Sequence, residues 1–224
     1  MNGYFITGTD TECGKTEITL GVMQWLQLQQ LNVTGMKPIA SGCEVTVDGL
    51  RNDDVDRILN QCSHSLTYSQ INCYSFQPAI APHIAAVEAG VDIDFKVIQT
   101  VADQLSQQSD RLVVEGVGGW RVPLGHDGAL SDLALMLDLP IILVVGLKLG
   151  CINHALLTAE SIQASGGKLV GWVGNHVDAT MSVAAENIQT LRSEIAVPCF
   201  GIVQNLAKPT AKQIAKYLDL NSRC

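Results

Sequence analysis

Residues 8–16 read Gly-Thr-Asp-Thr-Glu-Cys-Gly-Lys-Thr, and this segment limits the possible folds more than any other part of the chain. It follows an apolar run, Tyr4–Ile6, and from Ile18 to Leu28 apolar residues recur at steps of three and four, which predicts a helix with one buried face. A strand, a glycine-containing loop and a helix in this order can bind a polyphosphate, because loop N–H groups and the positive end of the helix dipole face the anion. In such a loop Lys15 would reach the outer phosphates and the Thr16 hydroxyl would be a ligand for Mg²⁺.

The match to the usual phosphate-binding loop is imperfect. That pattern has four residues between its glycines, whereas here Thr9 takes the place of the first glycine and Gly8 stands one position earlier. The alternative is a glycine-rich turn that merely begins a helix. The apolar run before the loop and the amphipathic pattern after it favour a nucleotide site.

Composition favours one folded domain over residues 1–224. Hydrophobic residues make up 47% of the chain and charged residues 16%, so disorder is not expected. The formal net charge of -8 argues against nucleic acid as a partner, because such a protein needs a basic face. We expect no signal peptide and no membrane span, since the most apolar segment, residues 139–147, is less than half the length that a membrane helix requires.

The seven cysteines show no Cys-x-x-Cys spacing and are odd in number. Reduced thiols and a cytoplasmic location are therefore the expectation. Cys13, inside the phosphate loop, is interpreted as a small buried filler; a redox switch is the alternative, because a helix N-terminus lowers the pKa of a thiol.

Strands and helices alternate along the sequence. Runs such as Ile141–Val145 lack polar alternation, which indicates strands buried on both faces. The sequence therefore predicts an α/β fold: a three-layer α/β/α P-loop NTPase-type fold with a mostly parallel central sheet flanked by helices. Strands are predicted at 4–7, 33–39, 111–115, 140–146, 168–174 and 199–203, and helices at 15–30, 54–60, 82–90, 94–108, 130–137, 153–165, 182–195 and 210–218.

Residues at the strand exits are expected to carry the chemistry, because ligands of such sheets gather at the carboxyl ends of the strands. Lys37 follows the second predicted strand and could place a second cation over the γ-phosphate; a solvated lysine is the alternative. Ser41 could offer a hydroxyl to a substrate or could be a plain turn serine. Glu115 ends a buried strand, which is costly unless it meets a cation, so we interpret it as a Mg²⁺ partner. Asp54 is the favoured second carboxylate, with its neighbours Asp53 and Asp56 as rivals.

Two later exits also carry polar groups. The Gly-rich segment before Asn153 offers free N–H groups to an anion such as a carboxylate, although Asn153 could equally be a helix cap. The Asn175 amide could hydrogen-bond adenine or could be a turn residue. His83, His126 and Asp127 have no second ligand at metal spacing, so no zinc site is expected.

Together these exits resemble one family, the ATP-dependent dethiobiotin synthetases of biotin biosynthesis. The likeness extends from the first strand to about Asn175, and it rests on four segments: residues 8–16, Lys37-Pro38-Ile39-Ala40-Ser41-Gly42, Val114-Glu115-Gly116-Val117-Gly118-Gly119 and Lys148-Leu149-Gly150-Cys151-Ile152-Asn153-His154. The resemblance implies closure of a ureido ring on 7,8-diaminononanoate. CO₂ adds to one amine to give a carbamate, which takes the γ-phosphoryl of MgATP; the second amine attacks the resulting carbamic–phosphoric anhydride and expels phosphate.

The resemblance also implies residue roles. Lys15 and Lys37 would steady the carbamate and the transferring phosphoryl, with Thr11 and Glu12 in the same loop, while Thr16, Asp54 and Glu115 would hold Mg²⁺. Ser41 would contact the diamine end. Gly150, Cys151 and Asn153 would bind the carboxylate of a substrate that lies in the active site of the partner subunit. This implies a homodimer with its active site at the subunit interface. The implied nucleotide-binding residues are Glu12, Cys13, Gly14, Lys15, Thr16, Glu17, Asp54, Glu115, Gly116, Val117, Gly118, Asn175, His176, Gln204, Asn205 and Leu206.

The chain departs from the common family pattern at His176, where Asp is usual, and at Gln204, where Pro is usual. Both positions fall at the expected base pocket, which leaves strictness for ATP open. Three rival functions remain. A partition-type ATPase would carry an extra Lys early in the loop, where this chain has Asp10. An amidotransferase would need a glutaminase, roughly another domain of chain, and a non-catalytic nucleotide-binding module would not need Lys37.

Overall fold

A six-stranded parallel sheet forms the centre of the computed structural model, which describes residues 1–222. The strand order is β12-β11-β10-β1-β7-β2, and every neighbouring pair is parallel. The strands are β1 (Gly3–Gly8), β2 (Val33–Met36), β7 (Arg111–Glu115), β10 (Ile141–Leu147), β11 (Leu169–His176) and β12 (Cys199–Val203). All seven residues of β10 are buried, as its unbroken apolar run predicts.

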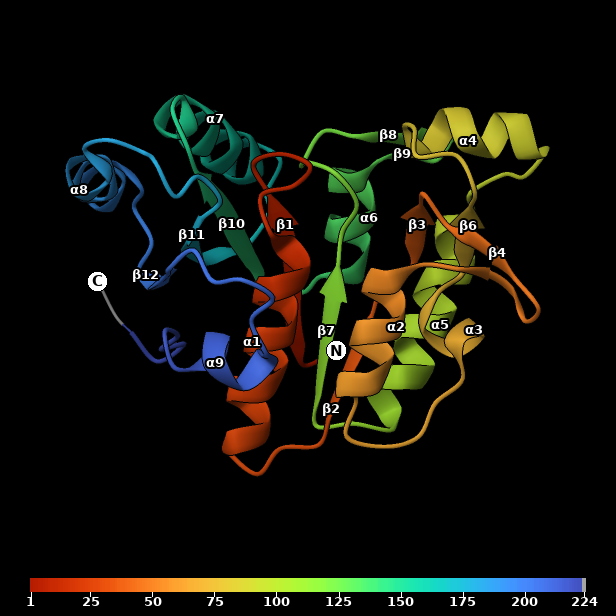
Figure 1. Cartoon of the computed structure of the whole chain (residues 1–224). Helices are drawn as coiled ribbons and strands as arrows, with labels where there is room; N and C mark the ends of the chain where they lie inside the picture. The colour runs from red at the N-terminus through yellow and green to blue at the C-terminus, as the bar shows by residue number, and fades with distance from the viewer. Residues whose placement is uncertain (223–224) are drawn as a thin grey trace.

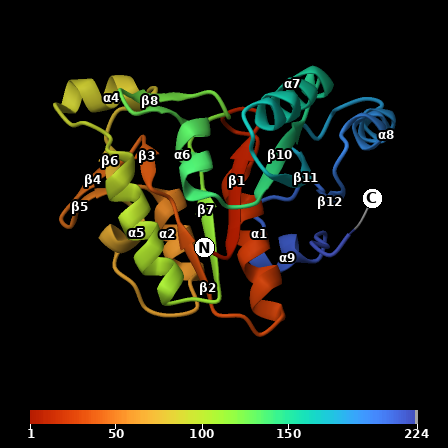
Figure 2. The same ribbon diagram turned by 180° about the vertical axis from the view of Figure 1, so that it is seen from behind.

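Helices cover both faces of this sheet. α1 (Lys15–Leu28), α2 (Asp53–Gln61) and α9 (Ala211–Ala215) lie in front of it in Figure 1, and α5 (Phe95–Gln107), α6 (Leu130–Leu137) and α7 (Cys151–Ala164) come to the front when the molecule is turned in Figure 2. α8 (Ala184–Glu194) packs beside α7. The predicted three-layer α/β/α fold with a parallel sheet is confirmed.

The predicted strand 33–39 is wrong in its second half. β2 ends at Met36, and β3 (Ile39–Ser41) instead pairs with β6 (Tyr74–Phe76) in a separate two-stranded sheet. Pro38 lies at the break, where its missing N–H removes a ladder hydrogen bond, and the Lys37 N–H donates to the carbonyl of Ile71. The chain therefore leaves the central sheet at Lys37, directly above its carboxyl edge.

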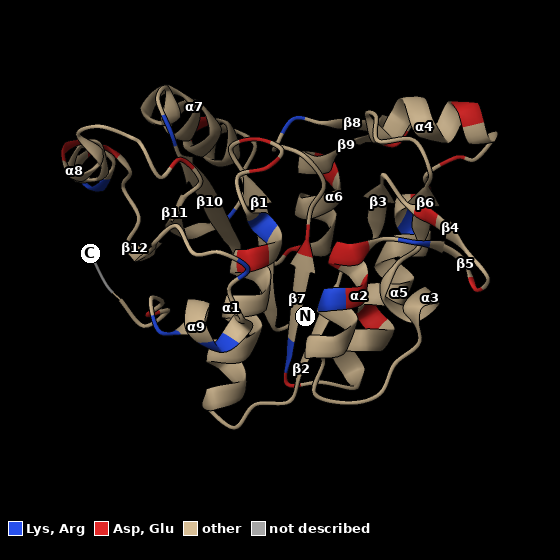
Figure 3. Cartoon of the chain, in the orientation of Figure 1, with Lys and Arg blue, Asp and Glu red and all other residues tan. Residues whose placement is uncertain are grey.

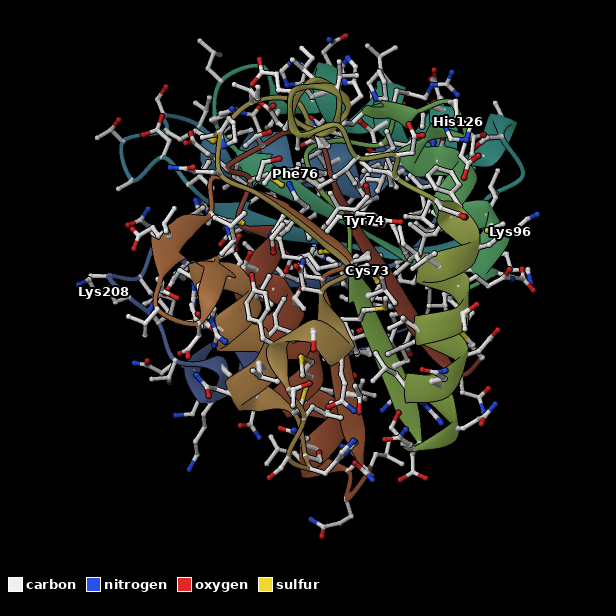
Figure 4. All side chains as sticks on the ribbon, turned by 90° about the vertical axis from the view of Figure 1, so that its right-hand side faces the viewer. Cys73, Tyr74, Phe76, Lys96, His126 and Lys208 are labelled. Atoms are coloured by element: carbon white, nitrogen blue, oxygen red, sulfur yellow. The ribbon has the colours of Figure 1, made fainter. Side chains whose placement is uncertain are left out.

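Several short elements beside this break have no counterpart among the predicted ones. They are β4 (Glu44–Thr46), β5 (Gly49–Arg51), α3 (Tyr68–Ile71), β8 (Pro123–Gly125) and β9 (Gly128–Ala129). Figure 4 shows the side of the molecule that carries these elements. Cys73, Tyr74 and Phe76 lie near the middle of this side, whereas Lys96 and His126 lie at its edge. The phenol oxygen of Tyr74 accepts the Asp94 N–H at 3.0 Å, which ties β6 to the start of α5. α4 (Pro82–Ala89) covers the upper end of this unit.

Two predicted helix boundaries are also wrong. α7 begins at Cys151, with Gly150 at φ 90° preceding it, so Asn153 lies inside the first turn and is not the cap. α9 spans only Ala211–Ala215, because the chain beyond it turns to form a bridge between Leu218 and Gly201. Within residues 1–222, none of the helices combines the length and hydropathy needed to cross a membrane.

Candidate active site

The phosphate loop leaves β1 at Gly8 and ends where α1 begins at Lys15. The Thr9 N–H donates to the Val144 carbonyl at 3.0 Å, which anchors the loop to β10. Gly14 has φ 86°, and a Cβ there would lie 2.0 Å from the Asn175 amide nitrogen, so both its conformation and its space require glycine. The Lys15 ammonium donates to the Asp10 carbonyl at 2.8 Å, so this side chain reaches back across the loop.

Opposite this loop, Lys37 and Glu115 meet in the interior. β1 and β7 are paired with Ile6 beside Glu115, which places the carboxylate next to the end of β1. Lys37 Nζ lies 2.6 Å from Glu115 Oε1 and 2.7 Å from Asp54 Oδ2, and the Thr16 hydroxyl donates to the same Glu115 oxygen at 2.9 Å. Figure 3 shows acidic and basic parts of the ribbon meeting where β7 ends and where α1 and α2 begin. Two strand exits, of β2 and β7, and two helix starts, of α1 and α2, thus converge on one point.

These contacts control the ionisation of the cluster. Burial alone would lower the pKa of Lys37, but Glu115 and Asp54 outweigh it and raise that pKa to about 12. Burial would raise the pKa of Asp54, but the Lys37 charge and its hydrogen bond dominate and lower it. Lys37 is therefore a cation and Asp54 an anion at neutral pH. The cluster combines a fixed positive charge with carboxylate oxygens in a buried site.

The oxygen atoms here fit Mg²⁺. Glu115 Oε2 is buried and has no hydrogen-bond partner, while the Thr16 hydroxyl and the Asp54 carboxylate lie on the same side of the cluster. Within residues 1–222, no group of three or more His, Cys, Asp or Glu side chains is arranged so that it could hold a metal ion by itself. Two carboxylates and a hydroxyl suit Mg²⁺, which usually keeps several waters and takes its other ligands from phosphate.

A cavity of about 690 Å³ opens beside the cluster. It is lined by twelve of the predicted site residues: Thr11, Glu12, Gly14, Lys15, Thr16, Glu17, Lys37, Ser41, Asp54, Glu115, Val117 and Gly118. The Ser41 hydroxyl oxygen is buried without a hydrogen-bond partner, as expected of a group available to a ligand. Arg57, Val122 and residues 79–82 also line the cavity but were not among the predicted site residues. The spacing of Arg57, one helical turn after Asp54, is the signal that could have indicated it.

The chain matches the family described as an AAA domain over residues 2–213. It is 49% identical over 221 residues to the ATP-dependent dethiobiotin synthetase of Pseudomonas aeruginosa strain UCBPP-PA14, covering 98% of this chain and 97% of that protein. The enzyme of the same name from Chromohalobacter salexigens is 46% identical, with 98% of both chains covered, and that of Vibrio parahaemolyticus is 39% identical, with 98% and 96% covered. This chain belongs to the dethiobiotin synthetase family.

Solved structures extend the likeness at the level of fold alone. The MinD protein of Aquifex aeolicus in its complex with MinC aligns with a TM-score of 0.59 at 12% identity, covering 96% of this chain and 86% of that one. FtsY of Thermotoga maritima aligns with a TM-score of 0.54 at 14% identity, covering 96% and 67%. The dethiobiotin synthetase family therefore shares its three-layer architecture with P-loop proteins of other functions.

The remaining predicted nucleotide-binding residues of this family member do not line the cavity. Asn175 is only 8% exposed, and its amide donates to the Cys13 carbonyl at 3.1 Å, so it supports the underside of the phosphate loop. Asn205 donates to the His176 carbonyl at 2.9 Å, which joins the exits of β11 and β12. Cys13 is 1% exposed, which favours the filler interpretation over a redox switch. Gln204 and Leu206 flank Asn205, and Gly116 sits against the ring of Phe5.

The predicted carboxylate-binding turn of Gly150, Cys151 and Asn153 also does not line the cavity of its own chain. It follows Lys148, whose ammonium lies 3.2 Å from Asp10 Oδ2 in the phosphate loop. This contact ties the segment just before α7 to the phosphate loop.

Proposed function

We propose that this chain is an ATP-dependent dethiobiotin synthetase, which forms the ureido ring of dethiobiotin from 7,8-diaminononanoate, CO₂ and MgATP and releases ADP and phosphate. The observation that carries the proposal is the convergence of Lys15, Lys37, Thr16 and Glu115 on one cavity in a chain that is 49% identical to enzymes of this name. Phosphoryl transfer requires cations and backbone N–H groups around the site of the transferred phosphoryl group.

The proposed reaction begins at one amine of the substrate. Its nitrogen bonds to the carbon of CO₂ and loses a proton, which gives a carbamate. A carbamate oxygen then attacks the γ-phosphorus, and the bond to the ADP oxygen breaks. The second amine attacks the carbonyl carbon of this anhydride, the ring closes, and phosphate leaves with the oxygen that had attacked phosphorus.

The predicted residues that line the cavity have roles that their positions support. Lys37, a buried cation, would stabilise negative charge on the carbamate and on the transferring phosphoryl. Lys15 would turn from the Asp10 carbonyl to the outer phosphates, with Thr11 and Glu12 beside it. The unpartnered Ser41 hydroxyl would bind the diamine end of the substrate.

Magnesium is proposed as the cofactor. Thr16, Asp54 and Glu115 would hold it, and it would neutralise charge between the outer phosphates. Lys37 contacts Glu115 through Oε1 and Asp54 through Oδ2, so Glu115 Oε2 stays available to the metal.

A homodimer with the active site at the subunit interface is proposed as well. Gly150, Cys151 and Asn153 lie outside the cavity of their own chain, so they could serve as the carboxylate site only for a substrate bound to a second copy. A cytoplasmic location is proposed on the free thiols of Cys13, Cys43, Cys62, Cys73, Cys151 and Cys199.

The partition-type ATPase finds no support in the loop. At the position where that class carries its extra lysine, this chain has Asp10, whose carboxylate pairs with Lys148 of the same chain. The test of the proposed function is direct: the protein is incubated with diaminononanoate, bicarbonate and MgATP, and dethiobiotin and ADP are sought by mass spectrometry. Equal amounts of both products are expected, whereas ADP formation that does not depend on the diamine would contradict the proposal.

A further inference from the structure

Glu17 and Arg57 form an ion pair at the rim of the cavity. Arg57 Nη2 lies 2.7 Å from the Glu17 carboxylate, and both residues line the cavity that holds Lys15 and Lys37. The Arg57 side chain is 31% exposed and the Glu17 side chain 26%, so solvent reaches the pair. It joins the first turn of α1 to α2.

Both residues lie next to the proposed phosphate and magnesium ligands. Glu17 directly follows Thr16 on α1. Arg57 stands three positions after Asp54, which places Asp54 and Arg57 on the same face of α2. The Arg57 charge also contributes to the lowered pKa of Asp54. Arg57 is therefore close enough to the cluster to act on whatever binds there.

The cavity carries more acid than base. Its charged lining consists of Glu12, Glu17, Asp54 and Glu115 against Lys15, Lys37 and Arg57. Lys37 is held by two carboxylates, one of them fully buried, whereas Arg57 is held by one partly exposed carboxylate. Exposed ion pairs contribute little to stability, while a guanidinium binds phosphate through two parallel hydrogen bonds. A polyphosphate entering the cavity can therefore compete for Arg57.

We propose that Arg57 is a phosphate-binding residue. Without nucleotide its guanidinium pairs with Glu17 at the rim of the cavity, and when the nucleotide binds, the guanidinium leaves Glu17 and binds the polyphosphate. This inference rests on the proposed function of the cavity as an ATP site. Glu17 then acts as an internal competitor that weakens nucleotide binding, and Arg57 favours the nucleotide with more phosphates.

The test measures binding of ADP and of a non-hydrolysable ATP analogue by titration calorimetry, with Mg²⁺ and in EDTA. Arg57→Gln should weaken binding of the analogue about fivefold to twentyfold and Arg57→Lys by less, because Lys keeps the charge but not the planar fork. Glu17→Gln should tighten binding about twofold to fivefold. Lys168→Gln is the matched control, since it removes one positive charge from an ion pair of 2.7 Å far from the cavity, and it should bind as the unchanged protein does.

The double variant Glu17→Gln/Arg57→Gln distinguishes two explanations. In the first, called exchange, Arg57 leaves Glu17 and binds phosphate; in the second, Arg57 only screens the negative charge of Glu17. Exchange predicts that the double variant still binds the analogue more weakly than the unchanged protein. If Glu17→Gln instead restores full affinity in the Arg57→Gln background and has no effect alone, Arg57 only screens Glu17 and the inference is wrong. Equal losses for ADP and the analogue, accompanied by a lower melting temperature, would show a purely structural pair and also overturn it. If the unchanged protein binds neither nucleotide, the proposed function and this inference fail together.

Discussion

Lys37 Nζ lies 2.6 Å from Glu115 Oε1, although the two residues are 78 positions apart and the Glu115 side chain is fully buried. A buried carboxylate of this kind is costly unless a cation meets it. Here the cation is Lys37, the residue at which the chain leaves the central sheet. The end of β2 at Met36 therefore places Lys37 where it can pair with Glu115. The same contact holds Lys37 beside the atoms proposed to bind magnesium, where a transferring phosphoryl would lie.

Lys37→Gln should lower turnover by at least about a hundredfold, because it removes a preorganised positive charge from the proposed transition state. MgATP affinity should change by less than about threefold, since Lys15 and the loop N–H groups remain. Steady-state kinetics and calorimetry measure the two quantities. Lys96→Gln, at an exposed position of α5, is the control, and turnover in Lys37→Gln equal to that of the control would remove Lys37 from the chemistry.

Glu115→Gln should weaken nucleotide binding by about tenfold or more when Mg²⁺ is present, because the unpartnered Oε2 loses its charge. In EDTA its affinity should equal that of the unchanged protein. The measurement is ATP-analogue binding in the two buffers. A similar loss in both would mean that Glu115 supports the loop and not the metal.

Gly8→Ala should destabilise the protein by about 1–3 kcal/mol, because a Cβ at Gly8 would lie 2.3 Å from the Cys13 sulfur. Gly8→Ala/Cys13→Ala should cost less than the sum of the two single changes, since it removes the sulfur that the new methyl group meets. Urea denaturation of the four proteins forms the cycle. Strict additivity would show that the two residues do not share this space.

Stability should fall at acid pH partly through Asp54. Its pKa is lower in the folded protein than the usual 3.8, because Lys37 outweighs the effect of burial. Its contribution to the free energy of unfolding is therefore complete above the unfolded pKa and is lost as pH falls below it. Asp54→Asn should show a shallower decline between about pH 5 and pH 2, measured by urea denaturation. Parallel curves would mean that the carboxylate gains nothing from Lys37.

The phosphate loop, the parallel sheet and the residues at its strand exits could be predicted because short patterns specify them. The apolar run of β10 identifies a strand buried on both faces, and Gly-Lys-Thr at residues 14–16 needs only its neighbours to be recognised. In parallel sheets the strand exits meet at one edge, so Glu115 could be placed near Lys15 without a structure.

What could not be predicted depends on distant parts of the chain. β3 pairs with β6, more than thirty residues later, and no short pattern specifies that pairing. Helix periodicity places Arg57 on the same face of α2 as Asp54, but its ion pair with Glu17 depends on how α1 and α2 pack, which the sequence pattern does not contain. The first turn of α7 begins two residues before Asn153 because Gly150 adopts a positive φ, which a sequence pattern does not specify.

The central claim is that a carbamate oxygen attacks the γ-phosphoryl beside Lys37. Turnover in freshly dissolved C¹⁸O₂, over times short compared with exchange into water, tests it most directly. The account predicts that the released phosphate carries one ¹⁸O atom and that the ureido carbonyl of dethiobiotin keeps the other. Phosphate without label, formed together with dethiobiotin, would contradict it, because the phosphoryl group would then not have been transferred to the carbamate.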